Sequence, residues 1–152
     1  FLTLTKGTGV INRIFHGYGK FEGEMDGRKN GALISMANGK AVAFAIFNLQ
    51  ARGEMFVTHN DPVYEGMIVG LAPKPGDMII NVMKGKQLTN MRTQGTDENV
   101  VLTPVRQMSI AEQLSMLNTD EALEITPKSL RLRKAILNPT ERKKNEKSGS
   151  PL

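Results

Sequence analysis

The stretch ALISMANGKAVAFAIF, residues 32–47, decides the expected fold class. At its centre is Asn38-Gly39, a dipeptide that strongly favours the two-residue turn of a β-hairpin. After this turn, large apolar side chains alternate with alanines, which is the period of a strand with two apolar faces. We therefore predict a hairpin whose strands cover residues 32–37 and 40–47, with Phe44 in the core.

Strand-like runs continue on the C-terminal side of this hairpin. They cover residues 54–58, 67–71, 78–83, 99–105, 124–126 and 129–134. Turn-forming residues separate many of the runs, and one helix is expected near residues 109–118. The sequence therefore predicts a mainly β fold with minor α, built from antiparallel strands and hairpins.

The expected helix begins with a capping signal. Ser109 and Glu112 have the spacing of a capping box, in which each side chain accepts a hydrogen bond from the other residue's backbone N–H. Ile110, Leu114 and Leu117 then fall on one side of the helix. We expect that side to be buried.

A long connection, residues 84–98, fits neither a helix nor a strand period. Connections of this length without regular structure are usually functional or disordered. Its cations, amides and hydroxyls suit contacts with RNA phosphates, 2′-hydroxyls and base edges, whereas it has no aromatic side chain on which a base could stack. The alternative is a solvated, mobile extension of a hairpin, and we expect residues 84–95 to be poorly ordered in the free protein. The candidate RNA-binding residues are Lys84, Lys86, Gln87, Thr89, Asn90, Arg92 and Thr93.

The net charge of +5 is concentrated in residues 128–152. The cations of this segment are Lys128, Arg131, Arg133, Lys134, Arg142, Lys143, Lys144 and Lys147, and its acidic residues are Glu141 and Glu146. Such an excess suits a polyanion such as RNA, and a solubilising tail is the alternative. Asn138-Pro139, an N-cap residue followed by proline, predicts a short basic helix within the segment.

Two leucines alternate with two arginines in residues 129–134. This period predicts a strand with Leu130 and Leu132 on a buried face and a cationic face opposite. We therefore predict a second basic surface in this region. Its residues are Lys128, Arg131, Arg133 and Lys134.

The composition argues against several kinds of site. The chain has no cysteine, and so neither a disulfide nor a thiolate metal site. The longest apolar run, residues 41–47, is too short to cross a bilayer. No GxxxxGK[ST] phosphate-binding motif occurs, and His16 and His59 lack partners at metal-ligand or catalytic spacing. We expect no catalytic residue and no metal site; an enzyme using one of the two histidines remains the least favoured alternative.

Six blocks of sequence occur in an order and spacing typical of one family. They are NGALIS (30–35), GKAVAFAIF (39–47), LQARG (49–53), VYEG (63–66), KQLTNMR (86–92) with GTDE (95–98), and ITPKSLRLRK (125–134). Together they closely resemble the C-terminal region of the BipA/TypA translational GTPases. The resemblance runs from about Thr5 to Lys144, nearly the whole chain.

The resemblance implies a domain organisation. Residues 1–20 resemble the last strand of an α/β domain of elongation factor G type, which would be incomplete here. Residues 21–138 resemble the family-specific, β-rich C-terminal domain, and residues 139–152 would be a basic, partly disordered tail. Because the chain opens with phenylalanine rather than methionine, we expect it to be either a processed product or a piece of a longer protein.

The resemblance also implies a function. The chain would be a ribosome-binding module whose loop, residues 81–98, contacts 23S rRNA near the peptidyl-transferase centre and the acceptor end of the A-site tRNA. The parent would be a monomeric, cytoplasmic, ribosome-associated GTPase acting in translation, ribosome assembly and stress adaptation, with GTP and Mg²⁺ as its cofactors. This chain lacks the GTPase domain, so we expect it to have no cofactor, no enzymatic activity and no membrane partner. The alternative is a structural interaction domain that organises neighbouring domains and touches RNA only incidentally.

Overall fold

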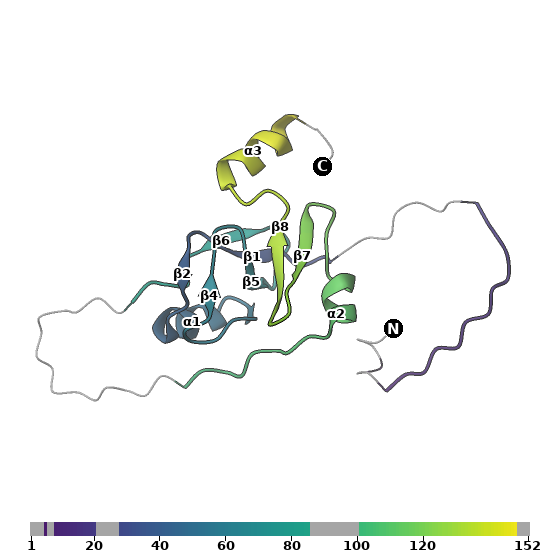
Figure 1. Cartoon of the computed structure of the whole chain (residues 1–152), viewed down its shortest axis with the longest axis horizontal. Coiled ribbons are helices and arrows are strands. Elements are labelled where there is room, and N and C mark those ends of the chain that lie inside the picture. Colours follow the sequence, from purple (N-terminus) through teal and green to yellow (C-terminus); the bar gives the residue numbers. More distant parts are fainter. Residues whose placement is uncertain (1–4, 6–7, 21–27, 86–100, 149–152) are drawn as a thin grey trace, which may run out of the picture.

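The computed structural model describes residues 5, 8–20, 28–85 and 101–148, and its centre is a four-stranded sheet (Figure 1). The strand order is β3 (Glu54–Met55), β5 (Ile68–Leu71), β1 (Ala32–Ser35) and β6 (Met78–Ile80). Strand β5 pairs antiparallel with both β1 and β3, whereas β1 pairs parallel with β6.

Two small antiparallel sheets and three helices complete the described fold. The sheets are β2 (Gly39–Lys40) with β4 (Pro62–Val63), and the hairpin of β7 (Glu121–Ile125) with β8 (Leu130–Lys134). The helices are α1 (Ala43–Gln50), α2 (Ile110–Ser115) and α3 (Pro139–Ser148). The predicted mainly β fold with minor α is confirmed.

Both faces of the central sheet are covered. On one face, Leu33 of β1 and Val69 of β5 share a core with Ile46 of α1. On the other face, Ile34 and Ile68 pack with Leu132 of β8. Covering on both sides explains why every residue of β1 and β5 is buried.

The predicted hairpin at Asn38-Gly39 is wrong. Strand β1 pairs with β5 and β6, and β2 pairs with β4, so the two halves of the predicted hairpin never meet. The Asn38 side-chain oxygen instead accepts a hydrogen bond from the backbone N–H of Glu65, at 2.9 Å. This bond holds the turn beside the start of β5.

The second predicted strand, residues 40–47, is helix α1 for most of its length. Its buried residues are Ala45, Ile46 and Leu49, which have helical rather than alternating spacing. Alanine and leucine are strong helix formers, and the sheet supplies the apolar surface that this side needs. Phe44 is only half-buried, so the prediction that placed it in the core is also wrong.

Helix α2 has the predicted capping box, but its buried side is not the predicted one. The Ser109 hydroxyl accepts from the Glu112 N–H, and the Glu112 carboxylate accepts from the Ser109 N–H at 2.8 Å. The bonds that the Glu112 carboxylate accepts from Ser109 lower its pKa. Ile110 and Leu114 are exposed, and the one buried residue of the helix is the polar Gln113.

The remaining element predictions have mixed outcomes. The strands expected at 67–71 and 129–134 and the basic helix after Asn138 are confirmed, and the Asn138 side chain caps that helix through the Thr140 N–H at 2.8 Å. The strand expected at 99–105 is wrong over 101–105, where the chain has no regular structure. Residues 8–20 are extended and run apart from the sheets, without a partner strand in the part of the chain that the structure describes (Figure 1).

A buried charge network fixes the β7–β8 hairpin to the rest of the fold. Lys134 is 2% exposed, and its ammonium group donates to Asp120 at 2.7 Å and to Glu121 at 3.0 Å and forms an ion pair with Asp77. Glu121 also receives two hydrogen bonds from the guanidinium of Arg28, at 2.7 and 3.1 Å. Four segments that are distant in sequence therefore meet at these charges.

The network shifts the pKa values of two of its members. Burial alone would lower the pKa of Lys134, but the hydrogen bonds to Asp120, Asp77 and Glu121 outweigh it and raise that pKa. Burial alone would raise the pKa of Asp77, but hydrogen bonds from Lys134 and from the Ala32 N–H lower it. Both groups are therefore held in their charged forms.

Candidate nucleic-acid interface

The described part of the predicted RNA-binding loop includes its first cation, Lys84. This side chain is exposed and follows β6. The other candidate residues lie outside the described residues. They are Lys86, Gln87, Thr89, Asn90, Arg92 and Thr93. The prediction that the loop is poorly ordered in the free protein concerns mostly the same undescribed part of the chain.

Lys84 lies at a groove of about 520 Å³ between α1 and β6, which we call the α1–β6 groove. Phe44 and Asn48 line it from successive turns of α1, because residues four apart share one side of a helix, and Arg52 lines it from the turn that follows the helix. From β6, the exposed Ile79 adds an apolar wall. The groove therefore combines an aromatic ring, an amide and two cations.

The two cations of the groove are not neutralised within the described chain. Neither Lys84 nor Arg52 forms an ion pair with any residue that the structure describes, and both are exposed. The Asn48 amide donates to the Phe44 carbonyl at 2.7 Å, which leaves its side-chain oxygen as an acceptor. Free cations beside a half-exposed aromatic ring suit phosphate contact and base stacking.

Sequence reasoning missed Phe44, Asn48 and Arg52 as interface residues. A strand followed by a turn, as the alternation predicts, would separate these three side chains. The i, i+4 spacing of Phe44 and Asn48 is the signal that groups these two on one side of a helix, and Arg52 follows them in the turn after α1.

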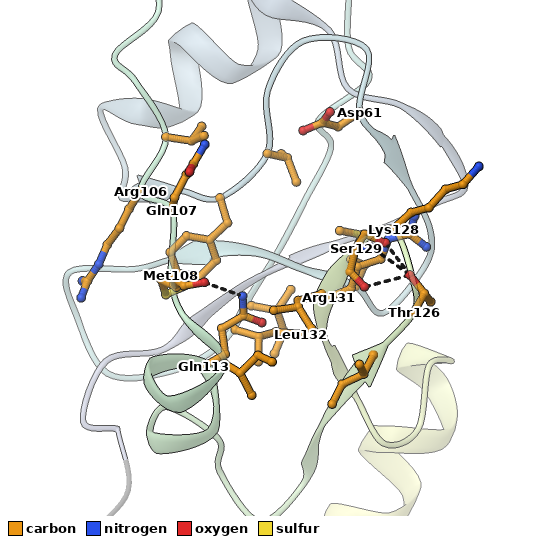
Figure 2. A pocket seen from close by; sticks show the side chains of 18 of the residues that line it. Asp61, Arg106, Gln107, Met108, Gln113, Thr126, Lys128, Ser129, Arg131 and Leu132 are labelled. Carbon is orange, nitrogen blue, oxygen red and sulfur yellow. Dashed lines mark hydrogen bonds between the residues drawn. The ribbon is translucent and has the colours of Figure 1, made fainter.

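A larger cavity, about 780 Å³, lies beside the turn of the β7–β8 hairpin (Figure 2). We call it the hairpin cavity. Its walls come from the β7–β8 turn and the start of β8, the segment before α2, α2 itself, the chain after β3 and the start of β5. The labelled lining residues include Arg106, Met108, Gln113, Lys128 and Arg131. Two members of the predicted second basic surface, Lys128 and Arg131, are therefore at this cavity.

The wall of the hairpin cavity contains an unpartnered polar atom. Gln113 is 8% exposed, and its amide nitrogen donates to the Met108 carbonyl at 3.4 Å (Figure 2). Its amide oxygen has no hydrogen-bond partner among the described residues. The oxygen is thus a buried acceptor without a donor.

Arg133 and Lys134 do not belong to the same exposed surface. The Arg133 guanidinium is held by the carbonyls of Lys134 and Ala135, at 3.1 and 3.3 Å. Lys134 is buried among carboxylates, so its placement on a basic surface is wrong. In the strand period Lys134 lies on the same face as Leu132, and three acidic side chains from elsewhere make that burial possible.

A partly buried tyrosine contacts the β7–β8 hairpin at Glu124. The Tyr64 hydroxyl donates to the Glu124 carboxylate at 2.6 Å, and Glu124 also pairs with Arg131 at 3.5 Å. Burial first, and then the hydrogen bond and charge of Glu124, raise the pKa of Tyr64 to about 12. Arg131 is therefore partly neutralised, whereas Lys128 has no ion pair with a described residue.

The structure assigns His59 a structural contact. Its ring nitrogen Nδ1 accepts from the Ala43 N–H at 3.2 Å, at the start of α1. Within residues 5, 8–20, 28–85 and 101–148, no group of three histidine, aspartate or glutamate side chains is arranged to hold a metal ion. No helix in these same ranges has the length and apolar character needed to cross a membrane.

Comparison with known proteins identifies the family. The model of the TypA/BipA C-terminal domain matches residues 30–139, well over half of the chain. The large ribosomal subunit assembly factor BipA of Buchnera aphidicola subsp. Schizaphis graminum is 50% identical over 145 residues, which is 95% of this chain and 24% of that protein. Proteins of the same name from Salmonella typhimurium and Escherichia coli (strain K12) are 46% identical with the same coverage. The chain spans about a quarter of the length of these relatives, and it belongs to the TypA/BipA family through its C-terminal domain.

Proposed function

We propose that this chain is the RNA-binding module of a ribosome-associated protein and that it binds through the α1–β6 groove and the loop that follows Lys84. The observation that carries the proposal is a pair of exposed cations, Arg52 and Lys84, which have no ion pair with a described residue and lie beside the partly exposed ring of Phe44. Cations at such a site position phosphates, and an aromatic ring can stack on a base. Relatives named as large ribosomal subunit assembly factors support ribosomal RNA as the target.

The finer proposal concerns the loop, residues 81–98. Its cations Lys84, Lys86 and Arg92 would contact phosphates of 23S rRNA near the peptidyl-transferase centre. Its amides and hydroxyls would contact the same rRNA and the acceptor end of the A-site tRNA. The guanidinium of Arg92 can make paired hydrogen bonds that a lysine cannot, so this position favours recognition over simple charge attraction.

The whole protein would be a cytoplasmic, ribosome-dependent GTPase. The proposal rests on the family and on relatives about four times as long as this chain. GTP and Mg²⁺ would then bind to another domain of the whole protein, and the C-terminal domain would anchor the GTPase on the ribosome.

A second candidate function is a structural interaction domain. The observation that favours it is the run of exposed apolar side chains in residues 8–20, where Ile14 is 93% and Tyr18 99% exposed. Apolar surface of this extent is typical of a segment that packs against another domain. Under this hypothesis, RNA contact through the α1–β6 groove would be incidental.

Binding to purified large ribosomal subunits separates the two functions. We expect the double variant Arg52→Ala/Lys84→Ala to bind at least about tenfold more weakly than the wild type, because each lost phosphate contact weakens binding. The control is Lys29→Ala/Lys74→Ala, which removes two exposed cations at the other end of the parallel pair β1 and β6. Equal binding by both double variants, with both folded, would favour the structural interaction domain.

A further inference from the structure

We propose that the hairpin cavity takes one unstacked nucleotide of the bound RNA, with the base inside and its phosphate at the mouth. The inference rests on the proposed RNA-binding function and adds a second site to it. It concerns a different region of the chain from the α1–β6 groove and the loop after Lys84.

The first argument is the buried oxygen of Gln113. A buried acceptor without a donor is rare in native proteins, because it has lost water without gaining a replacement bond. A ligand that satisfies it must carry an N–H or O–H group. Each nucleobase has N–H donors on its pairing edge, whereas a fully ionised phosphate or a carboxylate ion has none. The oxygen therefore favours the base, rather than the phosphate, in the interior.

The second argument is the composition of the walls. Phe56 contributes an aromatic ring, and Met108, Ile68 and Leu132 contribute apolar surface. The lining exposes polar and apolar surface in about equal measure, and about 780 Å³ lies within the usual range of volumes for small-molecule sites. A planar heterocycle with polar edges fits both properties of this cavity.

The third argument is the charge at the mouth. Lys128 is exposed and has no ion pair with a described residue, and Arg131 makes a single pair with Glu124 at 3.5 Å. Of the other charged residues of the lining, Arg106 pairs with Glu54 and Glu112, whereas Asp61 remains an anion whose carboxylate accepts from the Thr58 N–H at 2.7 Å. The hairpin end of the cavity is therefore cationic.

Hydroxyl groups stand at the same end. Thr126 and Ser129 are linked through their side-chain oxygens at 2.9 Å, and the Ser129 N–H donates to the Thr126 hydroxyl at 3.0 Å (Figure 2). This turn presents donors and acceptors next to Lys128. It suits the ribose and phosphate of a nucleotide whose base lies deeper in the cavity.

The test compares a fluorescein-labelled decamer of adenosine ribonucleotides with a decamer that has the same ribose-phosphate backbone and no bases. We expect the wild type to prefer the intact decamer by about tenfold or more. Gln113→Met keeps an unbranched helix-forming side chain and removes the acceptor, so it should cut that preference at least fivefold and leave the salt dependence unchanged. Lys128→Ala should have the opposite effects. It should leave the preference for the intact decamer unchanged, and it should reduce the slope of log affinity against log salt by about 0.7.

A second variant keeps the test valid if Gln113→Met does not fold. Phe56→Leu removes the aromatic ring and keeps an apolar side chain, and it should also reduce the preference for the intact decamer. An unchanged preference in either variant, with an unchanged thermal unfolding midpoint, would overturn the cavity proposal. Displacement of the decamer by free AMP at the decamer's own concentration would identify a free nucleotide as the ligand and overturn the RNA assignment.

Binding to large ribosomal subunits distinguishes a failure of the cavity proposal from a failure of the proposed RNA-binding function. A wild type that binds large subunits but does not distinguish the two decamers overturns the cavity proposal alone. A wild type that binds neither the subunits nor either decamer overturns both.

Discussion

Lys134 shows how one residue can hold distant parts of this chain together. Its ammonium group meets carboxylates from the loop before β6 and from the start of β7. Removing Lys134 would leave the buried carboxylate of Glu121 with Arg28 alone, and the partly exposed carboxylates of Asp77 and Asp120 without this cation. The residue therefore acts on stability rather than on RNA binding.

Replacing Lys134 with methionine should lower the free energy of unfolding by about 3–5 kcal/mol. Methionine fills a similar volume, so the loss reflects three carboxylates deprived of Lys134, of which the buried Glu121 keeps Arg28 as its cation. Urea denaturation measures the change, and Lys29→Met, at an exposed lysine, is the matched control. A loss below about 1 kcal/mol would show that Lys134 is not the centre of the network.

The same network predicts how stability depends on pH. The raised pKa of Lys134 gives a stabilisation that is complete below its ordinary value of 10.5 and is lost as pH rises through the raised value. The lowered pKa of Asp77 gives a stabilisation that is complete above its ordinary value of 3.8 and is lost as pH falls through the lowered value. The denaturation midpoint, measured as a function of pH, should therefore fall at both the acidic and the alkaline end of the pH range. In Lys134→Met the acid-side loss should be smaller, since Asp77 then keeps only its bond from the Ala32 N–H.

Tyr64 offers a spectroscopic check of its contact with the β7–β8 hairpin. The chain has two tyrosines, so the ultraviolet titration component lost in Tyr64→Phe belongs to Tyr64. That component should titrate near 12. In Glu124→Gln its pKa should fall only in part, because burial is the first cause of the shift. A component that titrates at 10.0 in the wild type would mean that the hydroxyl is open to solvent and makes no bond to Glu124.

At the scale of elements, the turn before β5 depends on a single glycine. Gly66 has a φ of +84°, and a Cβ at this position would lie 2.7 Å from the Cα of Leu137. Its N–H donates to Ser35 and its carbonyl accepts from Lys134, at 3.0 and 2.9 Å. The backbone of Gly66 is thus hydrogen-bonded to both β1 and β8, at a position where a side chain would clash.

Gly66→Ala should cost about 1–3 kcal/mol of stability, from backbone strain and from displacement of Leu137. Gly85→Ala is the matched control, because a Cβ there meets no atom of the described residues within 4 Å, and its effect should stay within about 0.5 kcal/mol. Thermal or urea unfolding measures both variants. Equal stability of the two would show that the turn can relax without cost.

The element predictions fail where tertiary contacts outweigh local patterns. The alternation in residues 40–47 is real, but alanine-rich sequence next to an apolar sheet face is more stable as a helix. In α2 the capping box is a local signal, whereas the burial of Gln113 depends on the segment around Met108 and on β8. The prediction of strand β8 is correct because its alternation and its burial agree, except at Lys134.

At the scale of the whole molecule, the family could be recognised from the sequence, and the geometry of the site could not. The order of six blocks is a property of the chain alone. The α1–β6 groove requires Arg52 and Lys84, which are far apart in sequence, to lie at one helix–strand boundary. The hairpin cavity requires four separate segments, which no local pattern brings together.

We propose above that the α1–β6 groove and the loop after Lys84 bind ribosomal RNA. The salt dependence of binding to large ribosomal subunits, compared between the wild type and Lys84→Ala/Lys86→Ala/Arg92→Ala, tests it most directly. If each side chain neutralises one phosphate, the slope of log affinity against log salt should become shallower by roughly two to three units. Unchanged affinity and slope in a folded triple variant would contradict the claim.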